Sequence, residues 1–263
     1  MIKSSNPALG ANVFASERSF TANEGTMTLQ GTVNKTLILL ACVVAPAAWV
    51  WAKLMPDTTS TMFAEAGVAS QAAAGVNGIM MLGAFGGFIM AMITIFNKKG
   101  APITAPIYAV CQGLFLGGIS AIFELRYPGI VIQAITLTFG TLFCLLMAYK
   151  SGLIKATENF KLGIVAATGA VCLIYVVDMI MGFFHSSITM VHSNGTFGII
   201  FSVIVVAIAA LNLVIDFDFI EKGAEMGAPK YMEWYGAFGL MVTLIWLYME
   251  ILRLLVKLQG NRR

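Results

Sequence analysis

Acidic side chains lie inside the apolar stretches of this 263-residue chain, where ionisable groups are not expected. Asp216 and Asp218 close one apolar run, Glu250 stands in the next, and Asp178 stands in an earlier one. An ionisable side chain near the centre of a membrane helix costs roughly 2.5–3.5 kcal/mol on insertion scales. Each acid is therefore a functional candidate that needs a partner, and the chemistry it suggests is the binding of a proton or a cation inside a membrane.

The composition is that of an integral membrane protein. The chain is 59% hydrophobic and only 11% charged, with a mean hydropathy of +0.85. Its net charge of +3 comes from Lys and Arg at the ends of apolar runs, where they set orientation and do not form a nucleic-acid patch. The four cysteines lie within apolar runs without a His at ligand spacing, so we expect no disulfide framework, no metal site and no cofactor.

Seven apolar runs are each long enough to cross a hydrocarbon core of ~30 Å as a helix. They are Lys35–Leu54, Val76–Phe96, Ile103–Phe123, Ile130–Tyr149, Leu162–Phe184, Phe197–Ile220 and Met232–Leu258. Because the runs are continuous and do not alternate, barrel strands are excluded. We predict an all-α membrane protein: a polar cytoplasmic segment over residues 1–33, then a seven-transmembrane-helix domain over residues 34–263. The longest loop is expected at Lys53–Gly75.

Basic residues predict the orientation of the chain. With the N-terminus in the cytoplasm, Lys53 and Arg126 are the basic residues of the outer loops, and a larger group lies on the inner side. The inner group is Lys3, Arg18, Lys35, Lys98, Lys99, Lys150, Lys155, Lys161, Lys222 and Lys230. We therefore expect a multi-pass protein of the cell membrane with a cytoplasmic N-terminus. This places Arg253, Lys257, Arg262 and Arg263 outside, against the same rule, unless the last span is re-entrant.

The acids are expected to form two layers. At about 1.5 Å per residue, Asp216 lies roughly 8 Å from the cytoplasmic end of its helix, whereas Asp178 and Glu250 lie roughly 27 Å and 30 Å from theirs. Asp216 and Asp218, extended by Glu233, are then an inner layer, and Asp178 with Glu250 is an outer one.

Each acid has an alternative interpretation. Asp216 and Asp218 are about 200° apart around a helix, so only one can face the interior. We choose Asp216, the alternative being a carboxylate at the membrane interface. Glu250 and Arg253 are i, i+3 neighbours, and either neutralise each other or line a path. Asp178 has no basic residue within one turn, so we expect it to be buried at the depth of Glu250.

Several motifs resemble the Bax inhibitor-1-like family. They are Asp216-Phe217-Asp218-Phe219-Ile220, Leu252-Arg253-Leu254-Leu255 and Gly113-Leu114-Phe115-Leu116-Gly117. The segment Met27-Thr28-Leu29-Gln30-Gly31-Thr32-Val33-Asn34-Lys35 resembles a bacterial branch of that family. The resemblance implies a seven-helix bundle whose last helix is central, in the bacterial inner membrane. It also implies a pH-sensitive calcium leak governed by two aspartates, one in each of the last two helices.

Only one aspartate of that implied dyad is present. Asp216 falls at the sixth-helix position, but matching Leu252-Arg253-Leu254-Leu255 puts Thr243 where the second aspartate should stand. Moving the register so that Glu250 supplies the acid breaks the downstream match. This departure bears on the expected calcium conduction and does not affect the expected fold.

Three classes of function compete. The first is a passive cation leak with Asp216, Asp218 and Thr243 at an inner gate and Asp178, Glu250 and Arg253 at an outer station. The second, intramembrane aspartyl proteolysis, needs two aspartates on separate helices, and the sequence lacks the Gly-x-Gly-Asp signature of such proteases, so we expect no enzyme. The third is a non-conducting regulator or partner of membrane-protein quality control. The expected partners are the lipid bilayer, cations including calcium, and other membrane proteins, without nucleic acid; the oligomeric state stays open.

Overall fold

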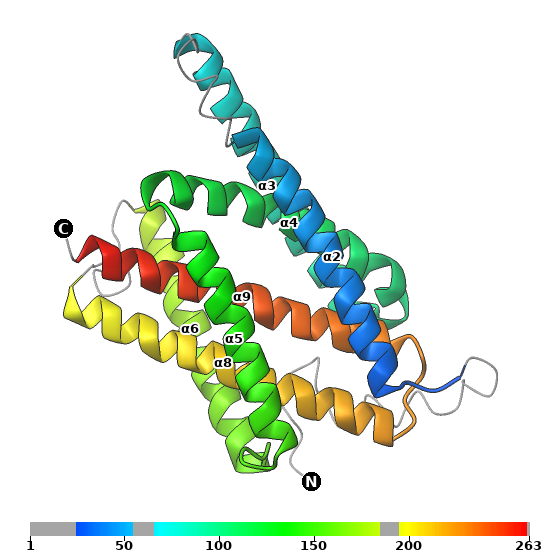
Figure 1. Cartoon of the computed structure of the whole chain (residues 1–263). Coiled ribbons are helices and arrows are strands. Elements are labelled where there is room, and N and C mark those ends of the chain that lie inside the picture. The colour runs from blue at the N-terminus through cyan, green and yellow to red at the C-terminus, as the bar shows by residue number, and fades with distance from the viewer. Residues whose placement is uncertain (1–24, 55–65, 185–194, 262–263) are drawn as a thin grey trace. The chain divides into compact units, whose positions relative to one another are not determined.

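Seven long helices make up most of the chain in a computed structural model that describes residues 25–54, 66–184 and 195–261 (Figure 1). They are α2 (Leu29–Leu54), α3 (Ala66–Phe96), α4 (Ala101–Arg126), α5 (Ile130–Lys150), α6 (Glu158–Phe183), α8 (Thr196–Glu225) and α9 (Met232–Gly260). A short 3-10 helix, η2 (Lys98–Gly100), precedes α4. All seven are long and apolar enough to cross a membrane, which confirms the predicted all-α, seven-helix membrane fold.

Helices α2 and α3 begin six and ten residues earlier than the hydropathy pattern predicted, the largest differences among the seven helices. Helix α2 already begins at Leu29, inside the segment expected to be polar and cytoplasmic, of which residues 1–24 lie outside the described part. Helix α3 begins at Ala66, so the loop expected at Lys53–Gly75 is shorter than predicted. Hydropathy detects only the part of a helix that crosses the bilayer, whereas the alanine-rich start of α3 favours a helix without being strongly apolar.

The chain divides into two units, each packed within itself. The first unit comprises Met1–Arg126 and Ile220–Met241, and the second comprises Tyr127–Phe219 and Val242–Arg263. Helices α8 and α9 therefore each contribute one part to each unit.

In the first unit, glycines bring three helices into close contact. Gly113 and Gly117 of α4 face the backbone of α2, and a Cβ on Gly117 would collide with the carbonyl oxygen of Ala47. Gly83 of α3 faces α4 in the same way, since a Cβ there would lie 2.6 Å from the carbonyl oxygen of Cys111. Small residues at such spacing allow helix backbones to approach closely, and here they pack the chain against itself.

In the second unit, α8 and α9 run antiparallel in one register. Asp216 contacts Thr243, and Ser202 contacts Lys257, so rising residue numbers on α8 meet falling numbers on α9. Asp216 lies 14 residues after Ser202 on α8, and Lys257 lies 14 residues after Thr243 on α9. The same register puts Ala209, which is fully buried, across from Glu250.

Helix α6 packs beside α8 in a similar antiparallel way. Lys161, near the start of α6, pairs with Asp218, and Thr168 accepts a hydrogen bond from Asn212 at 2.8 Å. The residues of α6 that make these contacts are seven positions apart (168 − 161), as are Thr168 and Tyr175. Polar groups in this unit therefore recur every two turns along one face of a helix.

Large apolar side chains stay exposed along the helices. Leu82, Phe96 and Leu173 expose 72%, 77% and 66% of their surface. In water so many exposed apolar groups would be an aggregation liability, whereas hydrocarbon solvates them favourably. The exposure pattern, with the seven helices, supports a multi-pass membrane protein.

Candidate functional site

Asp216 and Thr243 meet between α8 and α9 in the second unit. The Thr243 hydroxyl is the hydrogen-bond partner of the Asp216 carboxyl. The Oδ2 atom of Asp216 is buried and has no hydrogen-bond partner among the described residues. One oxygen of this carboxyl is therefore left for a proton, a cation or water.

Asp218, two residues further along α8, points to a different neighbour. Its Oδ2 lies 2.6 Å from Nζ of Lys161 on α6, and only 9% of the residue is exposed. Asp216 turns to α9 and Asp218 to α6, as their angular separation on a helix requires. The expectation that Asp216 alone would face the interior is wrong, because Lys161 neutralises Asp218 and allows its burial.

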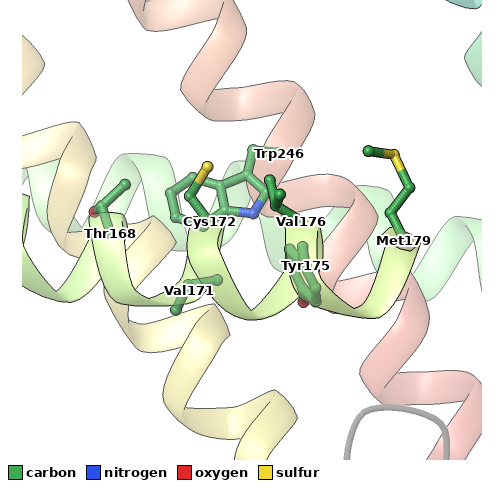
Figure 2. Close-up of a pocket in the computed structure, with 7 residues that line it drawn as sticks. All are labelled: Thr168, Val171, Cys172, Tyr175, Val176, Met179 and Trp246. Atoms are coloured by element: carbon green, nitrogen blue, oxygen red, sulfur yellow. The ribbon is translucent and has the colours of Figure 1, made fainter. Parts of the chain in front are cut away.

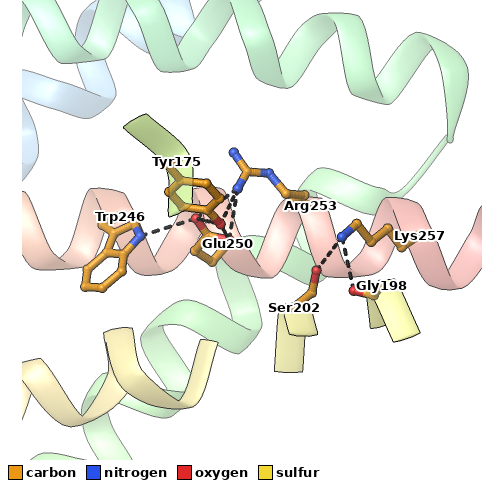
Figure 3. A network of polar contacts seen from close by, with 7 residues as sticks. All are labelled: Tyr175, Gly198, Ser202, Trp246, Glu250, Arg253 and Lys257. Atoms are coloured by element: carbon orange, nitrogen blue, oxygen red, sulfur yellow. Dashed lines mark hydrogen bonds and ion pairs between the residues drawn. The ribbon is translucent and has the colours of Figure 1, made fainter. Parts of the chain in front are cut away.

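Glu250 is the centre of a polar network on α9 (Figure 3). Only 2% of the residue is exposed. Nη1 of Arg253 lies 3.1 Å from Oε1 and 3.2 Å from Oε2, and the Tyr175 hydroxyl lies 3.0 Å from both oxygens. The Trp246 indole is a third partner, and its N–H donates to Oε1 at 3.3 Å. The local pairing of Glu250 with Arg253, one of the two alternatives weighed from sequence, is what the structure has.

Tyr175 couples the network to α6. Arg253 Nη1 donates a hydrogen bond to the Tyr175 hydroxyl at 2.6 Å, and the guanidinium lies over the phenol ring, 5.0 Å from its centroid. Sequence reasoning missed Tyr175 and Trp246. Helical spacing could have indicated Trp246, one turn before Glu250, but nothing local indicates a tyrosine 75 residues away.

Asp178 does not occupy the position expected for it. It lies near the end of α6 and is partly exposed, where a buried carboxylate was predicted. The helical register places Tyr175, almost one turn earlier, against Glu250. The prediction of a buried Asp178 is therefore wrong, because Tyr175 is the residue of α6 that reaches the acid of α9.

Lys257 is a buried cation that sequence reasoning treated only as a topology signal. It is 4% exposed, and its ammonium donates to the carbonyl oxygen of Gly198 at 3.1 Å and to the Ser202 hydroxyl at 2.8 Å (Figure 3). It lies seven residues after Glu250, which lies seven after Thr243. We call the line of contacts at Thr243, Glu250 and Lys257 the polar seam.

Glu233 belongs to the first unit and binds residues at the start of α2. Its Oε1 accepts hydrogen bonds from the backbone N–H and the hydroxyl of Thr28 at 3.0 Å and 2.9 Å. Its Oε2 lies 2.7 Å from Nζ of Lys35. The carboxylate thus holds the segment before α2 against the start of α9, and its charge is paired with that of Lys35, so we do not take it as the gate.

A groove of about 390 Å³ runs along α6 (Figure 2). Its walls are largely apolar side chains, with Trp246 of α9 lying over Cys172 and Val176. Tyr175 lines this groove and also touches Glu250, so one side of the polar seam adjoins the apolar surface.

Side chains that could bind a metal ion do not cluster among the described residues. Among the described residues, no three His, Cys, Asp or Glu side chains gather closely enough to hold a metal ion together.

Comparisons with known proteins identify the family. No curated protein and no solved structure matches the chain. The family model described as Bax inhibitor 1 like matches residues 6–260, which is nearly the whole chain. The chain therefore belongs to the Bax inhibitor 1-like family.

Proposed function

We propose that the protein is a passive, pH-sensitive cation leak with Asp216 as its protonatable gate. Calcium is the cation that the family resemblance implies. The observation that carries the proposal is the difference between Asp216 and the other buried acids. Asp218, Glu233 and Glu250 each have a Lys or Arg nitrogen at 2.6 Å, 2.7 Å and 3.1 Å. Asp216 has the Thr243 hydroxyl and a buried oxygen without a partner in the described chain.

A carboxylate in that position cannot stay ionised and dry. Inside a membrane helix it must be protonated, hydrated or accompanied by a cation. A protonated Asp216 leaves the surroundings neutral and dry, whereas an ionised one attracts water and a cation. The state of one carboxyl thus couples pH to the presence of a cation between α8 and α9.

Thr243 limits how strongly the gate responds to pH. Its hydroxyl stabilises the ionised carboxylate by donating a hydrogen bond, but it cannot share a proton as a second carboxyl would. Two carboxyls that share one proton titrate as a coupled pair. We therefore expect a weaker pH response than in relatives that have both aspartates.

The proposal includes the direction of transport and the setting of the protein. The sequence carries no nucleotide-binding motif, so the ion would move down its gradient. We assign the chain no catalytic role, and we place it in a bacterial inner membrane with the N-terminus in the cytoplasm.

The test is ion flux across liposomes that contain the purified protein, from acidic to alkaline pH. We expect flux of calcium or of a monovalent cation that rises with pH in the wild type. Asp216→Asn should abolish the pH dependence, because the amide cannot ionise. Asp218→Asn is the matched control: the change is the same and lies on the same helix, but it affects a carboxylate already paired with Lys161.

Asp218→Asn should keep the pH response. If the wild type passes no cation at any pH, the leak proposal fails and the regulatory function takes its place. If Asp216→Asn keeps the full pH response, another group is the gate.

A further inference from the structure

The ammonium of Lys257 occupies the polar seam where an external cation could otherwise bind. Asp216 and Thr243 form one end of the α8–α9 contact, and Ser202 with Lys257 forms the other, about 21 Å away at 1.5 Å per residue. The charge at one end is an acid without a cation, and at the other end a cation bound to neutral oxygens.

The ligands of Lys257 are those that a small cation takes. A backbone carbonyl and a hydroxyl replace water around ions in channels, and here Gly198 and Ser202 supply them at 3.1 Å and 2.8 Å. Ser202 is 1% exposed, so this is a buried site and not a surface contact. The ammonium fills it as a monovalent ion would.

The direct partners of Lys257 are neutral oxygens, and Glu250 attracts its ammonium only from a distance. That carboxylate already has Arg253 at 3.1 Å and the hydroxyl of Tyr175 at 3.0 Å. With Arg253 neutralising Glu250, the charge of Lys257 remains as a net positive charge at its end of the seam. A fixed positive charge in a narrow, poorly hydrated path opposes the entry of other cations.

We infer that Lys257 is a tethered cation plug: its ammonium sits in a cation site formed by the Gly198 carbonyl and the Ser202 hydroxyl, and blocks ion passage along the seam. The inference rests on the proposed leak. Conduction then requires the Lys257 side chain to withdraw, and the vacated site is one for a monovalent cation, since it presents neutral oxygens only.

The plug is tested by potassium flux into liposomes that contain the full chain. Lys257→Met keeps the length and packing of the side chain and removes its charge, and Lys257→Arg keeps the charge. We expect Lys257→Met to raise potassium flux several-fold over the wild type and Lys257→Arg to leave it near the wild-type value. Lys53→Met, the same change near the end of α2, is the control and should have no effect.

Folding and route are checked with two further measurements. Thermal unfolding in detergent should show that Lys257→Met is folded, because methionine fills the volume of the lysine stem and removes a buried charge, although it takes a donor from the Ser202 hydroxyl. Adding Asp216→Asn to Lys257→Met should remove the pH dependence of the raised flux. That result would show that both residues act on one path.

The outcomes separate the two proposals. If Lys257→Met is folded and its flux equals that of the wild type, the plug is refuted and the leak stands; Lys257 then only fastens α8 to α9. If the raised flux keeps its pH dependence when Asp216→Asn is added, the ion does not follow the seam and the plug is also refuted. If neither the wild type nor Lys257→Met passes any cation, the leak fails and the plug with it.

Discussion

The hydroxyl of Tyr175 lies 3.0 Å from both carboxylate oxygens of Glu250, although the two residues are 75 positions apart in the chain. Arg253 donates to both partners from one nitrogen. The three groups form a closed triangle in which a carboxylate, a phenol and a guanidinium each contact the other two. This triangle fastens α9 to α6.

Removing the arginine should cost more than removing the whole charge pair. Arg253→Met leaves Glu250 buried without a cation, and we expect a loss of about 1–3 kcal/mol in the free energy of unfolding, less than for a fully buried pair because Arg253 is partly exposed. The double variant Glu250→Met with Arg253→Met should recover part of that loss. Thermal unfolding in detergent micelles measures both, with Tyr175→Phe as a milder control that keeps the charge pair.

A double variant less stable than Arg253→Met alone would contradict this account. It would mean that Glu250 stabilises the fold through Tyr175 and Trp246 and not mainly through Arg253.

A second carboxyl next to Asp216 should shift the pH response to higher pH. Thr243→Asp places two acids that can share one proton between α8 and α9, and such pairs titrate as a coupled unit. We expect the change of flux in liposomes to move to higher pH than in the wild type, because the repulsion between two carboxylates holds the shared proton more tightly. Thr243→Asn, which cannot ionise, is the control, and an equal response in both variants would refute the coupling.

Gly31 should tolerate no side chain. A Cβ there would collide with the carboxylate of Glu233, which its contacts with Thr28 and Lys35 hold in place. We expect Gly31→Ala to lower the free energy of unfolding by about 1–3 kcal/mol, as overpacking does. Gly169→Ala on α6 meets open space and should instead stabilise by about 0.5–1 kcal/mol. Thermal unfolding of the two variants side by side decides the matter, and an unaffected Gly31→Ala would show that Glu233 can move aside.

The orientation of the chain can be read with reporter fusions. The basic residues predict that Lys98 and Lys99, between α3 and α4, lie in the cytoplasm. A reporter that is active only in the cytoplasm should work when fused after Lys99 and fail when fused after Arg126. The reverse pattern would overturn the predicted topology.

The sequence predicted the helices well, because each crossing helix must be apolar along about 20 residues and that signal is local. It misplaced the starts of α2 and α3, since helix outside the bilayer carries no hydropathy signal. The pairing of Glu250 with Arg253 could be predicted from the sequence because the two residues are one helical turn apart.

The contacts that sequence reasoning missed are those between distant helices. Ser202 and Lys257 are 55 positions apart, and neither residue type indicates which helix it meets. Asp178 is expected at the acid of α9 because it carries a charge, whereas the helical register brings Tyr175 of α6 to Glu250. Packing of helices, and not residue chemistry, assigns these partners.

The seven-residue spacing of Thr243, Glu250 and Lys257 has a mechanical consequence. A straight helix drifts by about 20° per heptad, so groups repeated every seven residues stay on one line only if the helices coil around each other with a left hand. A rotation of α9 about its axis would move Thr243 and Lys257 away from their partners on α8 and Glu250 away from Tyr175 on α6 at once. We therefore expect a movement of α9 to change the three sets of contacts together and not one by one.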